Sequence, residues 1–149
     1  NLDVGLKGFY LCSQQAARAM VAQGDGGAIV STSSVHGQRA WKTDAAYGAA
    51  KAGLISLTQT SAIEAAPNVR VNCVAPGAVM TPATKTALPS KELREETSKT
   101  IPLKRIAEPN EIASIIAFLL SDESSYLTGI CIAADGGKTI DLNAGISME

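Results

Sequence analysis

The hydrophobic residues in the first third of the chain indicate a helix followed by a strand. Residues 1–23 carry apolar side chains at helical spacing, and the glycines of GDGG at 24–27 end this pattern. The run AIVSTSS that follows is rich in β-branched residues and predicts a buried strand at 28–33. A polar segment, residues 34–44, then predicts a loop.

A second helix and a second strand follow in the same order. The segment YGAAKAGLISLTQTSAIEAA predicts a helix at 45–65, which Pro67 ends. VRVNCVA then predicts a strand at 69–75, and the Pro-Gly pair directly after it predicts a turn.

The last third of the chain contains one further helix and strand. A long helix begins near Pro109, a residue that suits a first helical turn, and its apolar stripe ends before SDESS. GICIAA predicts a last strand at 129–134. Residues 76–107 contain prolines, threonines and charges. They are interpreted as a long functional loop with one short helical patch at 91–98.

Helices and strands that alternate in this order imply parallel strand pairing through right-handed helical crossovers. The predicted fold class is therefore α/β, a parallel sheet with flanking helices, and the chain shows no domain boundary. Three strands make a thin sheet for this architecture, because parallel sheets are normally covered on both faces. We therefore expect further strands upstream of residues 28–33.

Composition and charge narrow the class of protein. The chain has 13 basic and 14 acidic residues, a net charge of −1, and neither a basic block nor a basic amphipathic stretch. This distribution argues against nucleic-acid and membrane partners. The cysteines, Cys12, Cys73 and Cys131, are widely spaced in apolar segments. They predict buried free thiols rather than a disulfide or metal framework, and hence a cytoplasmic location.

Candidate chemistry lies around the second predicted helix. Tyr47 and Lys51 are four residues apart and therefore lie on one helical face. A phenol is a poor base at neutral pH, and a neighbouring ammonium makes it a better one. Such a pair can take a proton from an alcohol or give one to a carbonyl. Ser34 lies thirteen residues before Tyr47, at a strand end, where a hydroxyl can hold the substrate oxygen.

Each part of this arrangement also has a plainer interpretation. Tyr-x-x-x-Lys alone is usually an exposed surface pair, and Ser33 and Ser34 alone are more often a strand end or a cap. Pro76 and Gly77 alone are an ordinary turn. The combination of a strand, a serine, a helix with Tyr-x-x-x-Lys and a second strand, in this order, is much less likely to arise by chance than any one of its parts.

Several motifs in this order resemble the short-chain dehydrogenase/reductase family. SSVHGQRAWKTDAAYGAAK resembles its active site, and VRVNCVAPGAVMTP resembles its strand, Pro-Gly turn and downstream threonine. RIAEPNEIASIIAFLLSDESSYLTGICIAADGG resembles its last helix and strand. The resemblance implies a Rossmann-type parallel sheet of which only the last three strands and their helices are present. Residues 1–149 are then the C-terminal catalytic portion of a single domain, with the N-terminal dinucleotide-binding half absent.

The resemblance also implies an activity and roles for residues. The protein would be an NAD(P)-dependent oxidoreductase with NAD or NADP as cofactor, no metal, an alcohol or carbonyl substrate, and a homo-oligomeric state, tetramer or dimer. Tyr47 would be the general acid/base, Lys51 would activate it and bind the nicotinamide ribose, and Ser34 would orient the substrate oxygen. The nicotinamide side would also be lined by Pro76, Gly77, Val79 and Thr81.

A finer resemblance concerns the substrate. SSVH followed by Trp41 is similar to the sugar-oxidising glucose 1-dehydrogenases, as are IPLKRIAEPNEIAS and SYLTGICIAADGGKT. On this resemblance His36 and Trp41 bind substrate beside Ser34 and Tyr47, since an imidazole and an indole face suit a polyol ring. The plainer alternative is an exposed histidine and a packing tryptophan. The other loop residues, GQRAWKTDAA, do not match that group, so glucose itself is not implied.

Two departures from the family bear on function. The family carries an Asn where this chain has Gly5, and that Asn supports a helix bend and a bound water in the proton relay. The sequence also contains no glycine-rich G-x-x-x-G-x-G turn, which would hold the pyrophosphate. A truncated, non-catalytic assembly module is therefore the second hypothesis. A reductase of 3-oxoacyl thioesters or ketones is the third, although Arg39 and Lys42 are too few for a basic surface that would dock an acyl carrier protein.

Overall fold

A parallel sheet forms the middle layer of the molecule. The computed structural model describes residues 1–141, and its three strands lie in the spatial order β1-β2-β3. β1 (Gly27–Thr32) pairs in parallel with β2 (Val69–Pro76), which pairs in parallel with β3 (Cys131–Ala134). The α/β class and the parallel pairing predicted from the alternation of helices and strands are confirmed.

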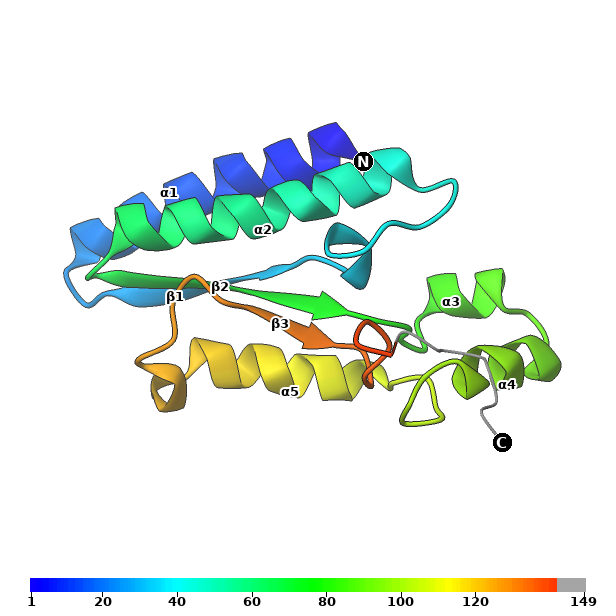
Figure 1. The fold of residues 1–149 in the computed structure, drawn as a ribbon. Helices are drawn as coiled ribbons and strands as arrows, with labels where there is room; N and C mark the ends of the chain where they lie inside the picture. Colours follow the sequence, from blue (N-terminus) through cyan, green and yellow to red (C-terminus); the bar gives the residue numbers. More distant parts are fainter. Residues whose placement is uncertain (142–149) are drawn as a thin grey trace.

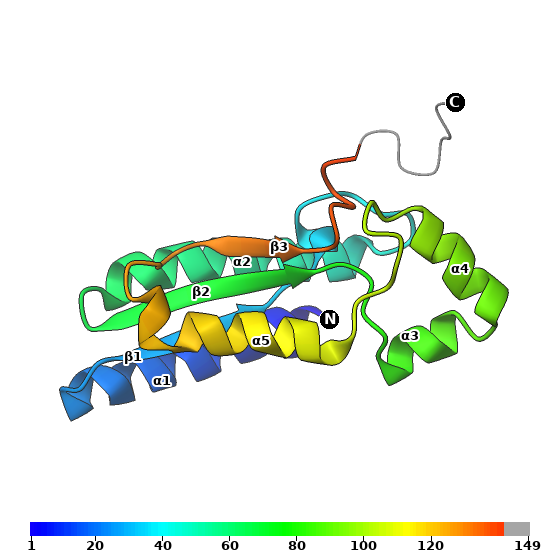
Figure 2. The same ribbon diagram turned by 90° about the horizontal axis from the view of Figure 1, so that it is seen from below.

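Helices cover both faces of this sheet (Figure 1). α1 (Gly8–Gln23), which follows a π-helical turn at Leu2–Lys7, and α2 (Ala45–Ala65) lie on one face. α5 (Pro109–Leu120) lies on the other face, along the strands, as the view from below shows (Figure 2). None of the helices within residues 1–141 combines the length and the apolarity that crossing a bilayer requires.

Alternation of side chains along β2 supplies both layers of the core. Successive strand residues point to opposite faces of a sheet, so neighbouring valines on β2 enter different clusters. The third predicted long helix is α5, and its apolar stripe packs on the sheet, as expected for apolar residues that recur at the helical period. The buried members on the α2 side are Ala62, Ala65, Val69 and Val71, and those on the α5 side are Val74, Ile112 and Leu119.

Arg70 fastens the C-terminal end of α5 to the sheet. Its guanidinium donates hydrogen bonds to the carbonyl oxygens of Leu119 and Ser121, each at 3.0 Å, and to Ser124 Oγ at 2.9 Å. The last carbonyls of a helix have no partner within the helix, so a neighbouring cation both satisfies them and stabilises the negative end of the helix dipole. One side chain of β2 therefore fixes where α5 ends.

The segment 76–107, interpreted as a loop with one helical patch, holds two helices. α4 (Lys91–Lys99) corresponds to the expected patch, whereas α3 (Pro82–Ala87) was not predicted. Thr81 caps α3 by accepting the Thr84 N–H on its Oγ1 at 3.2 Å, and a proline starts the helix. Six residues with two threonines give a weak helical pattern, so the cap decides the conformation. Both helices lie beyond the carboxyl ends of the strands (Figure 1).

Substitution of Leu119 tests the packing of α5 on the sheet. Leu119→Ala should lower the free energy of unfolding by about 2–5 kcal/mol, because a fully buried side chain is removed and a cavity remains. Leu120→Ala is the matched control on the same helix. Its side chain is 48% exposed, so the change should stay below about 1 kcal/mol. Urea unfolding followed by circular dichroism measures both, and equal losses would contradict this packing.

Candidate active site

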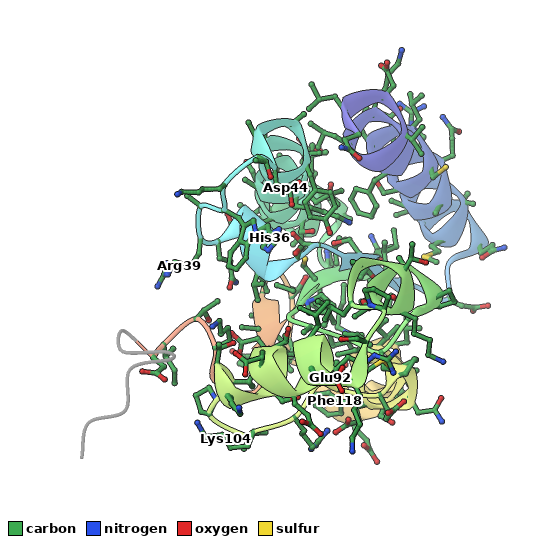
Figure 3. All side chains as sticks on the ribbon, turned by 90° about the vertical axis from the view of Figure 1, so that its right-hand side faces the viewer. His36, Arg39, Asp44, Glu92, Lys104 and Phe118 are labelled. Carbon is green, nitrogen blue, oxygen red and sulfur yellow. The ribbon has the colours of Figure 1, made fainter. Side chains whose placement is uncertain are left out.

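Functional side chains collect at the end of the sheet where β1 and β2 finish. Ligands of parallel α/β sheets bind in the crevice outside the carboxyl ends of the strands. Figure 3 looks onto this end of the molecule and labels His36, Arg39 and Asp44 on the segment that leads into α2. The predicted site residues must meet here to act together.

The two serines after β1 differ in what they bind. Ser33 Oγ donates a hydrogen bond to the backbone oxygen of Lys51 at 2.7 Å, which ties the end of β1 to α2. Ser34 begins the 3-10 turn Val35–Gly37, and its Oγ accepts the N–H of His36 at 3.2 Å. This bond uses a lone pair of the Ser34 hydroxyl and leaves its proton available to donate to a substrate oxygen.

Tyr47 and Lys51 lie one turn apart on α2, as their spacing predicts. Lys51 Nζ lies 5.6 Å from the centre of the Tyr47 ring and donates to the Thr32 carbonyl oxygen at 2.7 Å. Burial, partly opposed by the charge of Cys73, lowers the pKa of Lys51. A half-buried ammonium beside a phenol acts on it through a lower dielectric than water, which strengthens its field.

Gly37 lets the turn after β1 press against α2. A Cβ at this position would lie 2.7 Å from the carbonyl carbon of Lys51 and 2.8 Å from its oxygen. Both are backbone atoms of a packed helix, so they cannot move aside cheaply. The close approach of Ser34 to the face of α2 that carries Tyr47 therefore depends on the missing side chain of Gly37.

The turn after β1 and the Tyr47 face of α2 form one wall of the site, and the turn after β2 forms the other. The Gly77 N–H donates to the Ala134 oxygen at 3.0 Å, and a Cβ at Gly77 would lie 2.8 Å from the Asp135 Cβ. Thr81 follows in this wall and uses its Oγ1 to cap α3 through the Thr84 N–H. Close contact with the end of β3 and a helix cap therefore hold this wall in place.

The two walls enclose a cleft of about 430 Å³. Residues separated by as much as 84 positions in the sequence, from Thr32 to Ile116, share it, because the ends of β1 and β2 meet α2 and α5 at this end of the sheet. The cleft brings together every residue predicted for proton transfer or for contact with nicotinamide: Ser34, Tyr47, Lys51, Pro76, Gly77, Val79 and Thr81.

The first turns of α5 line the same cleft and were not among the predicted site residues. Ile112 and Ile116 belong to the apolar stripe that the sequence indicates, but a helical period says only that they face the protein. It does not say that the helix begins level with the strand ends. The residues that α5 contributes are Pro109, Ile112, Ala113 and Ile116.

His36 and Trp41 lie beside the cleft, where they line an adjoining hollow of about 430 Å³. The imidazole stacks on the indole, with ring centres 5.2 Å apart and planes 10° apart, and meets the Tyr47 ring edge-on at 5.8 Å. Its Nδ1 lies 3.3 Å from an Asp44 carboxylate oxygen without forming a hydrogen bond. His36 therefore stands between the hollow and Tyr47.

Gly5 sits in the π-helical turn that precedes α1. Its N–H donates to the Asn1 oxygen at 2.8 Å, whereas the Gly8 N–H reaches back to Asp3, five residues earlier, which widens the turn. A Cβ at Gly5 would meet only the Ala50 Cβ, at an ordinary 3.9 Å. The irregular backbone is present, and the position has room for a side chain that it does not carry.

A larger groove of about 530 Å³ lies between α1 and α2, away from these residues. It contains Arg18 and Glu64 but none of the predicted catalytic or cofactor-binding side chains. Size alone therefore does not identify the functional site, and the convergence of polar groups in the smaller cleft does.

Comparisons with known proteins agree with this geometry. A family profile described as enoyl-(acyl carrier protein) reductase matches residues 1–139. The chain is 46% identical over 140 residues to the 3-oxoacyl-(acyl-carrier-protein) reductase FabG of Thermotoga maritima, an alignment that covers 93% of this chain and 56% of that protein. It is 41% identical over 143 residues to L-rhamnose 1-dehydrogenase (NAD(P)(+)) of Azotobacter vinelandii, covering 95% and 56%.

A solved structure shows the same architecture. The aldohexose dehydrogenase of Thermoplasma acidophilum superposes with a TM-score of 0.91 at 34% sequence identity, over 99% of this chain and 60% of that one. The chain thus spans about half the length of the curated relatives that it matches.

A methyl group added at Gly37 tests the contact between the turn after β1 and α2. Gly37→Ala should lower the free energy of unfolding by about 1–3 kcal/mol, because the new Cβ overlaps the Lys51 backbone. Gly5→Ala is the matched control, since its Cβ meets nothing closer than 3.9 Å, and it should not destabilise the protein. Thermal unfolding of both variants measures the difference, and an unaffected Gly37→Ala protein would show that the turn does not press on the helix.

Proposed function

The chain belongs to the short-chain dehydrogenase/reductase family, and on this premise we propose that it carries the proton-transfer part of an NAD(P)-dependent oxidoreductase that interconverts an alcohol and a carbonyl. The observation that carries the proposal is the single cleft that holds Ser34, Tyr47 and Lys51 together with the Pro76–Gly77 turn. The cleft therefore contains both the proton-transfer groups and a surface that could bind a nicotinamide ring.

The extent of the chain fits one part of a domain. It covers 56% of the length of its curated relatives, and its sheet holds three parallel strands within the described residues. We therefore assign residues 1–149 to the C-terminal catalytic portion of a single domain, whose other portion would bind the adenine and pyrophosphate. A cytoplasmic homo-oligomer remains the expectation.

The cleft residues fit a nicotinamide. A side chain at Gly77 would collide with Asp135, so the Pro76–Gly77 turn packs closely against the end of β3, and both residues line the cleft. Apolar groups such as Val79 and Ile116 offer one surface to the ring, and the Lys51 ammonium lies opposite for the ribose hydroxyls. A bound NAD or NADP would supply the hydride acceptor or donor at this wall, and the side chains of the cleft would handle the proton.

Proton transfer is assigned to Tyr47 and oxygen binding to Ser34. In the oxidative direction the Tyr47 oxygen takes the alcohol proton as the substrate carbon loses its hydride. The Ser34 hydroxyl proton, which the His36 N–H leaves unused, donates to the same substrate oxygen and holds it in line. In the reductive direction Tyr47 returns the proton to the oxygen.

Lys51 supports Tyr47 and is itself held without the family Asn. Its Nζ donates directly to the Thr32 oxygen at 2.7 Å, and its backbone oxygen accepts from Ser33 Oγ at 2.7 Å. The first bond holds the ammonium and the second ties the α2 backbone to the end of β1, although Gly5 contributes no side chain. Retention of this arrangement favours the enzyme over the non-catalytic assembly module.

A sugar or polyol is the substrate class that the surroundings favour. The His36–Trp41 stack borders Tyr47, and an aromatic face with a neighbouring imidazole suits a hydroxyl-rich ring. Two relatives are named as dehydrogenases of sugars, L-rhamnose and aldohexose. The resemblance to glucose 1-dehydrogenases points the same way, without naming glucose.

A 3-oxoacyl thioester or ketone is the second candidate substrate. A relative that is 46% identical to the chain is named as a 3-oxoacyl-(acyl-carrier-protein) reductase. The proton-transfer groups would serve both substrates equally, so the substrate wall distinguishes them.

Replacement of Tyr47 tests the acid/base role. Tyr47→Phe should lower kcat by at least about 10²–10⁴-fold, the usual contribution of a positioned proton donor, while cofactor binding stays near normal. Tyr126→Phe is the matched control because Tyr126 is fully exposed. The assay follows reduction of NAD⁺ and NADP⁺ separately with sugars, polyols and secondary alcohols. Near-normal turnover of Tyr47→Phe would rule out the assignment, and a wild-type protein that turns over none of these substrates or a 3-oxoacyl thioester would favour the assembly module.

Replacement of Trp41 separates the two substrate classes. Trp41→Ala should raise KM for a sugar about tenfold, which corresponds to about 1.4 kcal/mol, while kcat changes little. Trp41→Phe, which keeps an aromatic face, should restore most of the affinity. A 3-oxoacyl thioester that is turned over faster than any sugar, with no effect of Trp41→Ala on the sugars, would favour the second candidate.

A further inference from the structure

Two cysteines lie side by side beneath the active-site helix and have no part in the proton-transfer chemistry. Strand register pairs Ser31 with Cys73 and Cys73 with Cys131, so the three side chains form a row across β1, β2 and β3. Paired residues of parallel strands point to the same face of the sheet. Ser31 Oγ and Thr58 Oγ1 lie 3.0 Å apart, which places this row on the α2 face.

The two cysteines are paired neighbours on β2 and β3 and differ in burial. Cys73 is fully buried on the central strand, whereas Cys131 is half-buried on β3. A hydrogen bond from the Cys131 thiol, opposed by burial and aided by Ser31, lowers the pKa of Cys73. The same hydrogen bond, with burial, raises the pKa of Cys131. Of the two sulfurs, that of the half-buried Cys131 is the one that an oxidant in solution reaches, and Cys73 is its neighbour on the central strand.

The dithiol is also in contact with the substrate loop. Gln38 Nε2 donates a hydrogen bond to Cys131 Sγ at 3.6 Å. Gln38 follows the 3-10 turn that holds His36, and it lines the hollow that also holds Trp41. A change of bonding at Cys131 Sγ therefore reaches the loop whose aromatic stack borders Tyr47.

We propose that Cys73 and Cys131 form an oxidisable dithiol that a hydroperoxide converts to a disulfide, with release of Gln38 and rearrangement of the substrate loop. First, the half-buried Cys131 sulfur attacks the hydroperoxide while its thiol proton moves to the leaving oxygen. The O–O bond breaks, Cys131 becomes a sulfenic acid, and the oxidant leaves as water or an alcohol. Then Cys73 sulfur attacks Cys131 sulfur, the S–S bond forms, and the S–O bond breaks to give water with the remaining thiol proton. The two thiols together lose two hydrogen atoms, and the hydroperoxide gains them.

The backbone allows this bond. Neighbouring strands lie about 4.7–4.9 Å apart. Disulfides join residues whose Cα atoms are about 4.4–6.8 Å apart, so paired positions on β2 and β3 fall within reach. Formation of the bond removes the thiol hydrogen that Cys131 gives to Cys73 and shifts the sulfur that accepts from Gln38.

Alkylation after oxidation tests the disulfide itself. The purified protein is treated with hydrogen peroxide, unfolded, alkylated with N-ethylmaleimide and analysed by mass spectrometry. The untreated chain carries three cysteines and should take up three alkyl groups. The oxidised chain should take up one, on the exposed Cys12, and yield a crosslinked Cys73–Cys131 peptide that dithiothreitol separates. This readout is independent of the reaction that the cleft performs.

Matched cysteine variants assign the bond. Cys12→Ser should still form the crosslink, whereas Cys131→Val should retain a peroxide-resistant Cys73 thiol and form none. Valine suits a strand on a half-buried position, and circular dichroism confirms that this variant is folded. A crosslink that includes Cys12, or irreversible oxidation of Cys131 without loss of the Cys73 thiol, would overturn the proposal.

Fluorescence tests the connection to the loop. Trp41 is the only tryptophan of the sequence and is stacked on His36, so its emission reports on this stack. Oxidation should change the emission intensity of the wild-type and Cys12→Ser proteins, dithiothreitol should reverse the change, and Cys131→Val should show none. A crosslinked protein with unchanged Trp41 emission would overturn the coupling to the loop.

Discussion

The geometry of the active site depends on the two hydrogen bonds that join Lys51 to the end of β1. Ser33 Oγ binds the Lys51 backbone oxygen, and Lys51 Nζ binds the Thr32 backbone oxygen, each at 2.7 Å. Together they set both the height of α2 above the sheet and the direction of the ammonium. Tyr47 is one turn away on the same helix, so its position follows. Gly37 completes the contact by leaving no side chain between the turn and the helix.

The parallel sheet explains why so few residues can build this site. All three strands end on the same side, so the segments that follow them share one edge of the molecule (Figure 1). The turn after β1 supplies the Ser34 hydroxyl, the turn after β2 supplies Pro76 and Gly77, and α2 adds Tyr47 and Lys51 to the same cleft. Arg70, from the opposite face of the same β2, holds α5 so that its first turns close the cleft.

Helix α2 lies next to two groups of reactive side chains, one at the strand ends and one on the sheet beneath it. Above the strand ends it presents Tyr47, and over the sheet it covers Ser31, Cys73 and Cys131. Gln38 connects the two regions, because it binds Cys131 Sγ and belongs to the loop that holds His36. The loop that holds His36 and the row of thiols therefore share one structural element, although they use different side chains.

Local sequence patterns predicted most of the elements and their pairing. The helix of Tyr47 and Lys51 and the apolar stripe of α5 follow from a period that each segment carries within itself. Helix α3 could not be predicted in this way, because a six-residue helix with two threonines has almost no periodic signal and depends on the cap at Thr81.

The sequence by itself thus determined the α/β class, the parallel order and the placement of Tyr47 and Lys51 one turn apart on one helix, since these rest on spacing within one element or on the order of elements. Only the tertiary structure decided that α5 lines the cleft, that His36 and Trp41 occupy a neighbouring hollow, and that Cys73 meets Cys131. Each of these depends on strand register and on where a helix begins relative to the sheet edge. Both arise from contacts between residues far apart in the chain, so no local pattern encodes them.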